Sequence, residues 1–117
     1  MYAQAKLLTQ CSRSLLCKPY PDTAEYLCEW LGYDQFLAAS SGVEACEAAV
    51  KLARKWGYTI KGVEDNQASI ILANNCFWGR SITASGNCSD PTRYTNFGPH
   101  TPGFHLVDYD DIGAIEA

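Results

Sequence analysis

Apolar and polar positions follow a helical period between residues 43 and 57, and this is the strongest pattern in the chain. One face carries Val43, Cys46, Val50, Ala53 and Gly57, flanked by Ala45, Ala49, Leu52 and Trp56. The opposite face carries Glu44, Glu47, Lys51, Arg54 and Lys55. This arrangement predicts an amphipathic helix that runs to about Tyr58, with Gly57 as its stop signal.

Capping residues mark the start of this helix. Ser41 and Glu44 have the spacing of a capping box, in which each side chain accepts a backbone N–H near the first turn. Acidic residues come early and basic residues late, which suits the helix dipole. Glu47 and Lys51 have the spacing of a stabilising i,i+4 ion pair.

The remaining elements are shorter, and their order predicts an α/β fold. Thr23 is expected to cap a helix over residues 24–31, which Gly32 closes. The predicted strands are Phe36–Ala39, Ala68–Ala73, which reads as buried, and Phe104–Tyr109; a polar connection covers 62–67, and a long loop covers 85–103. Asp110 or Asp111 is expected to cap a last helix that begins at Ile112. Strands that alternate with helices indicate a mostly parallel sheet with flanking helices.

The length of the chain allows one domain at most, because 117 residues supply only about three strands and one full crossover helix. A parallel sheet of that size leaves much apolar surface uncovered. We therefore expect these strands to belong to a larger sheet, and the chain to be a piece of a larger protein.

Composition excludes several classes of function. Hydrophobic residues make up 47% of the chain and charged residues 19%, which is typical of a globular protein. The net charge of -4 argues against binding to a nucleic-acid backbone. We expect neither a membrane span nor a signal peptide, because no apolar stretch is long enough for either.

The six cysteines are Cys11, Cys17, Cys28, Cys46, Cys76 and Cys88, and none forms a C-x-x-C pair. That spacing does not fit a zinc ribbon, and we expect reduced core cysteines and an intracellular compartment. His100 and His105 are separated by Pro102 and Gly103, so they do not form a helical ligand pair. The sequence therefore predicts no metal site.

Two clusters of residues carry candidate chemistry. The turn at Ser41, Gly42 and Val43 joins a predicted strand to a helix N-terminus, where free N–H groups and the helix dipole favour an anion such as phosphate. The segment 74–80 follows the next strand, so both clusters are expected at one edge of a sheet. There Phe77 can cover a ring face and Arg80 can hold a carboxylate by two hydrogen bonds.

Each cluster also has a plainer interpretation. The turn can be an ordinary capped helix, because the S-G-x-E pattern is short and common. Phe77 can be a core aromatic and Arg80 a surface charge. For Trp78 we favour the core role.

The residues also resemble a known family. The stretches are 41–45, 51–58 (K-L-A-R-K-W-G-Y), 77–80 (F-W-G-R), 94–99 and 102–104. Together they are similar to the ornithine aminotransferases, which are class III, fold type I enzymes that depend on pyridoxal phosphate. The resemblance covers nearly the whole chain and is weakest at 14–21, where residues 14–19 depart from the usual sequence.

The resemblance implies a fold, a function and roles for particular residues. Residues 1–117 would be part of the large cofactor-binding domain, truncated at both ends. Backbone amides of Gly42 and Val43, with Ser41 at the turn, would hold the cofactor phosphate. Phe77 would stack on the pyridine ring, and Arg80 would bind a substrate carboxylate. The family acts on amino acids and 2-oxo acids as homodimers, and the loop 85–103 resembles a segment near the subunit interface.

The intact enzyme would move the terminal amino group of ornithine to 2-oxoglutarate, which gives glutamate semialdehyde and glutamate. The lysine that binds the cofactor covalently has no match among Lys6, Lys18, Lys51, Lys55 and Lys61, so we expect the chain alone to be inactive. Two alternatives stay open: another class III aminotransferase of the acetylornithine or aminobutyrate type, and a non-catalytic fragment that binds phosphate or dimerises. The compartment would be the mitochondrial matrix or the cytoplasm.

Overall fold

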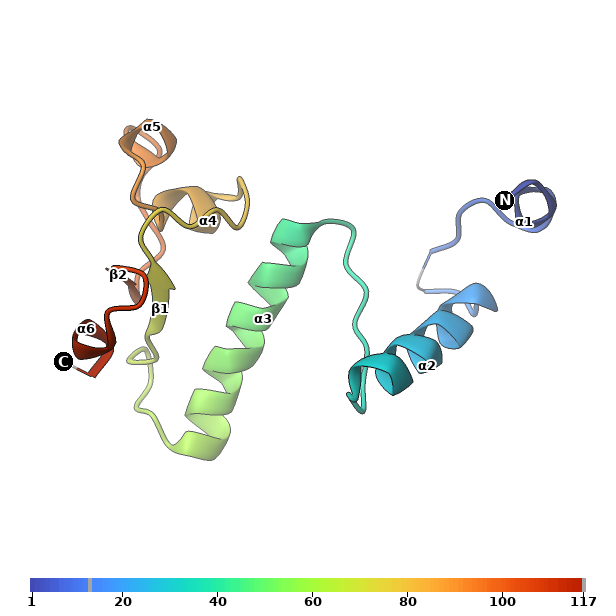
Figure 1. The fold of residues 1–117 in the computed structure, drawn as a ribbon, viewed down its shortest axis with the longest axis horizontal. Helices are drawn as coiled ribbons and strands as arrows, with labels where there is room; N and C mark the ends of the chain where they lie inside the picture. Colours follow the sequence, from blue (N-terminus) through green and yellow to red (C-terminus); the bar gives the residue numbers. More distant parts are fainter. Residues whose placement is uncertain (13, 117) are drawn as a thin grey trace. The chain divides into compact units, whose positions relative to one another are not determined.

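The chain forms two compact units, Met1–Ala38 and Ala39–Ala117, and each is described by itself. The structure is a computed structural model that describes residues 1–12 and 14–116 (Figure 1). Among the described residues, the first unit holds two helices. The second holds the remaining helices and a small parallel sheet, which confirms the predicted α/β class.

The helices of the first unit are α1, Tyr2–Leu7, and α2, Pro19–Leu31. The predicted start of α2 at Thr23 is wrong, because the helix already begins at Pro19, whose missing N–H costs nothing in a first turn. Thr23 lies inside the helix, and its hydroxyl donates to the carbonyl oxygen of Pro19 at 2.6 Å. The predicted end is confirmed, since Gly32 adopts the left-handed conformation with φ of 73°.

The predicted strand at Phe36–Ala39 is not a strand in this structure. A strand is defined by its ladder of hydrogen bonds to a neighbouring strand. The sheet of the described residues consists of β1 and β2, Ile70–Ala73 and Phe104–Val107, and does not include this segment. The apolar character of this segment was therefore not enough to make it a strand.

The long helix of the second unit, α3, spans Gly42–Trp56 and confirms the main helical prediction. Its predicted stop at Gly57 is wrong, because Gly57 has a helical φ of -54°. The chain continues as a π-helical turn, η1, over Gly57–Lys61, and ends at Gly62 with φ of 77°. Gly57 is buried, but a Cβ there would meet Val63 and Ala68 only at ordinary contact distances of 3.8 and 4.0 Å, so neither a left-handed turn nor close packing requires a glycine at this position.

Strands β1 and β2 pair in parallel, as predicted, with Ile70 opposite Phe104 and Ala73 opposite Val107. Backbone bonds extend the pairing at both ends, from Ile70 to Gly103 and from Asn74 to Val107. The predicted burial of the first strand is wrong within the described residues, because the Ile71 side chain is 47% exposed. After β2, the carboxylate of Asp111 accepts the Ala114 N–H at 3.0 Å and caps α6, Ile112–Glu116.

Helix α3 runs antiparallel to the two strands. Near its C-terminal end, Arg54 donates to the carbonyl oxygens of Pro102 and Gly103 at 2.7 and 3.3 Å, just before β2 begins. Near its N-terminal end, Val43 lies against Gly79, which follows the end of β1. The helix N-terminus is thereby placed beside the segment that leaves the carboxyl end of β1 (Figure 1).

The predicted loop at 85–103 contains helical turns. Helix α4 spans Ile82–Gly86 and α5 spans Pro91–Tyr94. Their N-caps are Ser81, whose hydroxyl accepts the Ala84 N–H, and Asp90, whose carboxylate accepts the Thr92 N–H. The buried apolar side chains of the described residues, Ala84 and Cys88, lie in this region. These short turns therefore enclose the small core of the second unit.

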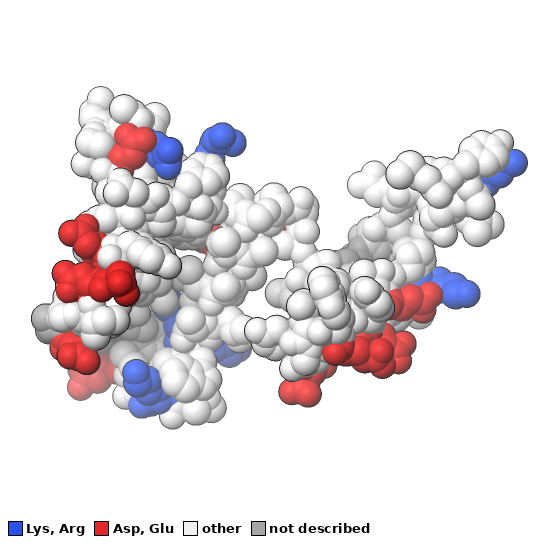
Figure 2. All heavy atoms as spheres, in the orientation of Figure 1, with Lys and Arg blue, Asp and Glu red and all other residues white. Residues whose placement is uncertain are grey.

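The outer face of α3 and η1 carries exposed apolar side chains beside the exposed Lys51 and Lys55. Leu52 is 70% exposed, Trp56 53%, and Ile60 in η1 72%. Two predicted polar positions, Glu47 and Arg54, instead face the rest of the unit, because Glu47 accepts from the Ser81 hydroxyl and Arg54 binds carbonyls. Uncharged surface is also prominent in Figure 2.

Candidate functional site

The N-terminus of α3 is fixed by its own cap. Ser41 is the extended N-cap residue, and its hydroxyl accepts the Glu44 N–H at 3.3 Å. The Glu44 carboxylate in turn accepts the Ser40 N–H at 2.8 Å. This is the predicted capping box with its return bond shifted one residue toward the N-terminus, because the carboxylate reaches Ser40.

The cap also controls the charge of Glu44. Hydrogen bonds from the side chain and backbone of Ser40 lower the pKa of the Glu44 carboxyl below its ordinary value. The carboxylate therefore stays ionised at neutral pH and stays directed at Ser40.

The amides of Gly42 and Val43 are left available by this arrangement. Neither donates to any acceptor among residues 1–12 and 14–116, whereas Glu44 and Ala45 donate to Ser41. A Cβ built on Gly42 would meet nothing within 4 Å, so the space in front of this turn is open. Two free amides at the positive end of a 15-residue helix can bind a phosphate group.

The second predicted cluster lies directly beside this turn. Gly79 has φ of 146°, and a Cβ there would lie 2.2 Å from Cγ2 and 2.4 Å from Cβ of Val43. Only a residue without a side chain permits this approach. The structure therefore brings Phe77–Arg80 and the start of α3 together, as the sequence predicted. The route differs, because the contact comes from Gly79 and not from two adjacent strand ends.

The side chains of Phe77 and Arg80 are open to a ligand. Phe77 is 58% exposed, and the Arg80 guanidinium carbon lies 5.5 Å from the centre of its ring. Arg80 forms no hydrogen bond or ion pair with any residue in the described part of the chain. Its guanidinium donors are therefore free to take a carboxylate by two parallel hydrogen bonds.

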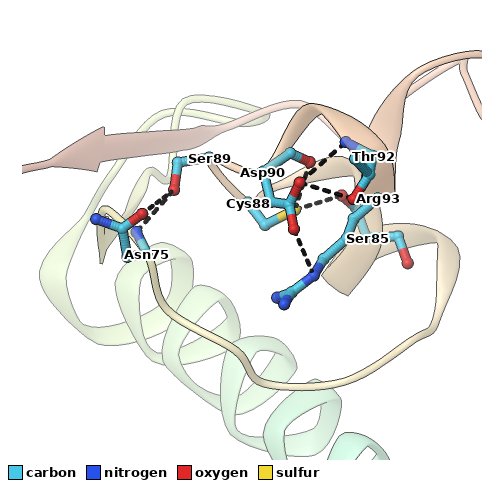
Figure 3. Close-up of polar contacts among 7 residues, drawn as sticks. All are labelled: Asn75, Ser85, Cys88, Ser89, Asp90, Thr92 and Arg93. Carbon is cyan, nitrogen blue, oxygen red and sulfur yellow. Dashed lines mark hydrogen bonds and ion pairs between the residues drawn. The ribbon is translucent and has the colours of Figure 1, made fainter.

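A second arginine, which the sequence analysis missed, reaches the same ring. The Arg93 guanidinium carbon lies 5.1 Å from the centre of Phe77. Its Nε is 3.1 Å from the Asp90 carboxylate in an i,i+3 ion pair (Figure 3). An acid and a base three residues apart across Pro91 signal a helical turn. That signal was present in a segment predicted as loop.

Trp78 packs against other elements of the fold. It is half-buried and stacks on Phe104 of β2 with ring centres 6.0 Å apart. The guanidinium carbon of Arg54 lies 4.9 Å from the centre of the same Phe104 ring. These contacts join α3, β2 and the segment after β1, which agrees with the core role favoured for Trp78.

The six cysteines are all free, with Cys88 buried and the others half-buried. Burial is the main cause that raises the pKa of the Cys76 thiol, and the nearby Cys88 adds to it. Among the residues that the structure describes, no group of three or more His, Cys, Asp or Glu is placed to hold a metal ion. No helix in the same residues has the length and apolar character that crossing a bilayer requires.

Comparison with known proteins identifies the family. Residues 1–116 match the model of the class III aminotransferases. A probable mitochondrial ornithine aminotransferase of Caenorhabditis elegans is 46% identical over 97% of this chain and 27% of its own length. The mitochondrial ornithine aminotransferase of Rattus norvegicus is 41% identical over 99% of this chain and 26% of its own.

Solved structures agree with the sequence relatives. The ornithine aminotransferase from Toxoplasma gondii matches with a TM-score of 0.92 at 44% identity, covering 97% of this chain and 27% of that one. An acetylornithine aminotransferase from Elizabethkingia anophelis matches with a TM-score of 0.73 at 41% identity, covering 98% of this chain and 27% of that one. The chain thus spans about a quarter of the length of the proteins it matches. These matches confirm the resemblance seen in the sequence, and the chain belongs to the class III aminotransferase family.

Proposed function

We propose that residues 1–117 are part of the large cofactor-binding domain of an ornithine aminotransferase. The complete protein would transfer the terminal amino group of ornithine to 2-oxoglutarate, giving glutamate semialdehyde and glutamate. Its relatives from Caenorhabditis elegans and Rattus norvegicus carry ornithine aminotransferase names at 46% and 41% identity. The structural match to the Toxoplasma gondii enzyme supports the same assignment.

The observation that carries this proposal is the contact between Gly79 and Val43. It sets the free amides of Gly42 and Val43 beside the segment that holds Phe77 and Arg80. Amide donors for a phosphate, an exposed aromatic ring and an arginine without a hydrogen-bond or ion-pair partner in the described residues therefore belong to neighbouring segments. This combination suits a flat, phosphorylated cofactor and a substrate with a carboxylate.

Each residue has a defined role in the proposed site. When bound, pyridoxal phosphate supplies the electron sink through which an amino group passes between substrates. Gly42 and Val43 donate their amides to the phosphate, while the Ser41 hydroxyl remains committed to the helix cap. Phe77 offers a ring face to the pyridine, and Arg80 orients the substrate by its carboxylate.

The lysine that attaches the cofactor is proposed to lie outside this segment. Lys51 is the lysine of α3 nearest to Gly42 in sequence. The two residues are nine positions apart, which corresponds to about 13 Å along the helix axis. Lys55 and Lys61 lie further along the same chain direction.

A second candidate substrate is N-acetylornithine, and one observation favours it. The acetylornithine aminotransferase of Elizabethkingia anophelis is 41% identical, close to the value for the ornithine enzymes. Its TM-score of 0.73 does not separate the two substrates, because ornithine aminotransferases match both at 0.92, from Toxoplasma gondii, and at 0.72, from Plasmodium falciparum. Comparing kcat/KM for ornithine and N-acetylornithine in the intact protein decides between them.

The proposed assembly and location follow from the family. We propose a homodimer of the intact protein, with segment 85–103 near the subunit interface. We also propose an intracellular enzyme of the mitochondrial matrix or the cytoplasm. The animal relatives are named as mitochondrial, whereas the names of the Plasmodium falciparum relatives give no compartment.

The test of the phosphate site is Gly42→Val in the intact protein. No neighbouring atom lies within 4 Å of a Cβ at Gly42, so the substitution is compatible with the fold of the chain itself. A bound phosphate would meet the new side chain, so the affinity for pyridoxal phosphate should fall sharply in an absorbance titration. Circular dichroism of the apo protein should keep its helical signal, because valine costs well under about 1 kcal/mol in a helix.

Ala49→Val is the matched control, since Ala49 is exposed on the same helix and distant from its N-terminus. It should leave cofactor affinity unchanged. If Gly42→Val changes the affinity by no more than about twofold, or about 0.4 kcal/mol, the phosphate assignment is wrong. The turn would then be a helix cap only.

A further inference from the structure

We propose that Arg93 is a positioning residue, which fixes the ring of Phe77 in the orientation that receives the cofactor. Its guanidinium carbon lies 5.1 Å from the centre of that ring. The consequence for cofactor binding rests on the function proposed above, whereas the contact between the two side chains does not. Arg93 thereby acts through Phe77 and need not touch the cofactor.

Asp90 anchors Arg93 from the other side. One carboxylate oxygen, Oδ2, lies 3.1 Å from the Arg93 Nε. The other, Oδ1, accepts the N–H and the hydroxyl of Thr92 at 3.0 and 2.7 Å (Figure 3). Both oxygens are engaged, so the carboxylate cannot rotate without losing several bonds. The Arg93 guanidinium is therefore bound by a carboxylate whose own position is fixed by the hydrogen bonds from Thr92.

A second set of bonds ties the Phe77 segment to the Asp90 segment. The N–H of Asn75 donates to the Ser89 hydroxyl at 2.7 Å, and that hydroxyl lies 3.4 Å from the Asn75 side-chain oxygen (Figure 3). Asn75 is two residues before Phe77, and Ser89 is one residue before Asp90. Buried Cys88 adds a thiol contact to the Ser85 carbonyl oxygen at 3.1 Å. Phe77 and Arg93, whose side chains meet at the ring, therefore lie on segments that are joined by the hydrogen bonds of Asn75 and Ser89.

The two arginines at Phe77 differ in how they are held. Arg80 has no polar partner in the described residues and remains available to a ligand. Arg93 forms an ion pair with Asp90, so its planar guanidinium is held in place and can restrain the orientation of the Phe77 ring. This division assigns substrate binding to Arg80 and ring positioning to Arg93.

A restraint on the Phe77 ring matters because this side chain is 58% exposed. An exposed ring that is free to change rotamer would lose that freedom on stacking with a cofactor, at a cost in binding. A cation over the ring face restrains it beforehand. Removing Arg93 should therefore weaken cofactor binding by about two- to fivefold, the range of an exposed cation–π contact.

The first experiment tests the contact in the intact apo protein, without any cofactor. In a spectrum of ¹⁵N-arginine-labelled protein, the Nε–H signal of Arg93 is assigned by its loss in Arg93→Lys. A ring-current shift of that signal should vanish in Phe77→Leu and persist in Arg80→Lys. An Arg93 signal that does not respond to Phe77→Leu overturns the inference, whatever the cofactor does.

The second experiment measures the dissociation constant of pyridoxal phosphate in a double-mutant cycle. Arg93→Ala should weaken binding in the wild-type background and have no effect in Phe77→Leu, because the arginine acts only through the ring. Arg93→Lys should give a smaller loss than Arg93→Ala, since an ammonium keeps a cation near the ring but lacks the guanidinium plane. Asp90→Asn keeps an oxygen for the Thr92 cap, removes the ion pair and should give part of the loss.

Lys55→Ala is the charge-matched control, because it removes an exposed cation from α3 and should leave the affinity unchanged. If Phe77→Leu weakens binding and Arg93→Ala does not, or if the two losses add, the positioning role is wrong. If neither Phe77→Leu nor Gly42→Val affects binding, the proposed cofactor site is wrong. The proposed role of Arg93 in cofactor binding would then be wrong as well.

Discussion

Gly79 and Val43 approach so closely that no side chain fits between them. A Cβ on Gly79 would lie 2.2 Å from Val43 Cγ2 and 3.3 Å from Val43 Cα. The contact joins the segment after β1 to the first turn of α3, although the two residues are far apart in the chain. The relation of Phe77 and Arg80 to the helix N-terminus therefore depends on one hydrogen atom in place of a methyl group.

Gly79→Ala should destabilise the intact protein by at least about 2 kcal/mol. The new methyl group collides with Val43, and the backbone at φ of 146° is strained for any L-residue. The measurement is the denaturant midpoint with its slope. Val43→Ala should restore little of the loss, because the two Cβ atoms would still lie about as close.

Gly62→Ala is the control for the backbone term. Gly62 also has a positive φ, of 77°, but nothing lies within 4 Å of a Cβ there. Its cost should be about 1–2 kcal/mol, the usual penalty for a left-handed residue. If both substitutions cost the same, the approach to Val43 is not tight.

Arg80→Lys should raise KM for the carboxylate substrate more than it weakens cofactor binding. Lysine keeps the charge but cannot form two parallel hydrogen bonds. The loss should be about 1.5–3 kcal/mol, the range for a hydrogen bond to a charged group. Steady-state kinetics and a cofactor titration on the same preparation separate the two effects. Unchanged KM with weakened cofactor binding would identify Arg80 as a phosphate contact.

The capping carboxylate predicts a pH dependence of stability. Hydrogen bonds from Ser40 lower the folded-state pKa of Glu44 below its ordinary 4.5. A depressed folded pKa means that the stabilisation is complete above the unfolded value and is lost as the pH falls through the folded value. Wild type should therefore exceed Glu44→Gln in denaturant midpoint at pH 7, and the difference should shrink below pH 4.5.

Glu64→Gln is a control for the loss of one carboxylate, because Glu64 lies in the connection after η1. Its effect on the midpoint should be small at either pH. A Glu44→Gln difference that stays constant or grows on acidification would show that the capping bond to Ser40 does not form.

The 117-residue chain by itself should have no transaminase activity. None of its five lysines matches the place of the cofactor-binding lysine in the family. Those of the second unit lie along α3 and η1, beyond the turn that holds Gly42. Purified chain should give no cofactor-dependent turnover of ornithine, while a complete ornithine aminotransferase assayed in parallel should. Turnover by the chain alone would contradict the proposed location of the lysine.

Local rules account for what could be predicted about α3. Its amphipathic period, the Ser41 cap and the acid at Glu44 act within one or two turns, so the sequence suffices to read them. The same holds for the end of α2 at Gly32 and for the cap of α6 by Asp111. The stop at Gly57 was wrong because Gly57 keeps a helical φ, and it is Gly62 that takes the left-handed conformation at the end of the helical segment.

Partners distant in sequence decided the remaining features. A strand needs a neighbour, so the apolar run at Phe36–Ala39 did not become one, whereas Ile70–Ala73 did by pairing with β2. Glu47 and Arg54 face the unit because Ser81, Pro102 and Gly103 bind them, which no helical period reveals.

For the candidate site, the sequence by itself predicted the residues that we propose carry the chemistry: Ser41, Gly42, Val43, Phe77 and Arg80. The tertiary structure decided that Gly79 brings the two clusters together and that Arg93, anchored by Asp90, reaches Phe77. The physical reason is the distance along the sequence between the residues that interact. Caps and helical periods depend on neighbours within a few residues, whereas a close approach between segments depends on the whole packing around them.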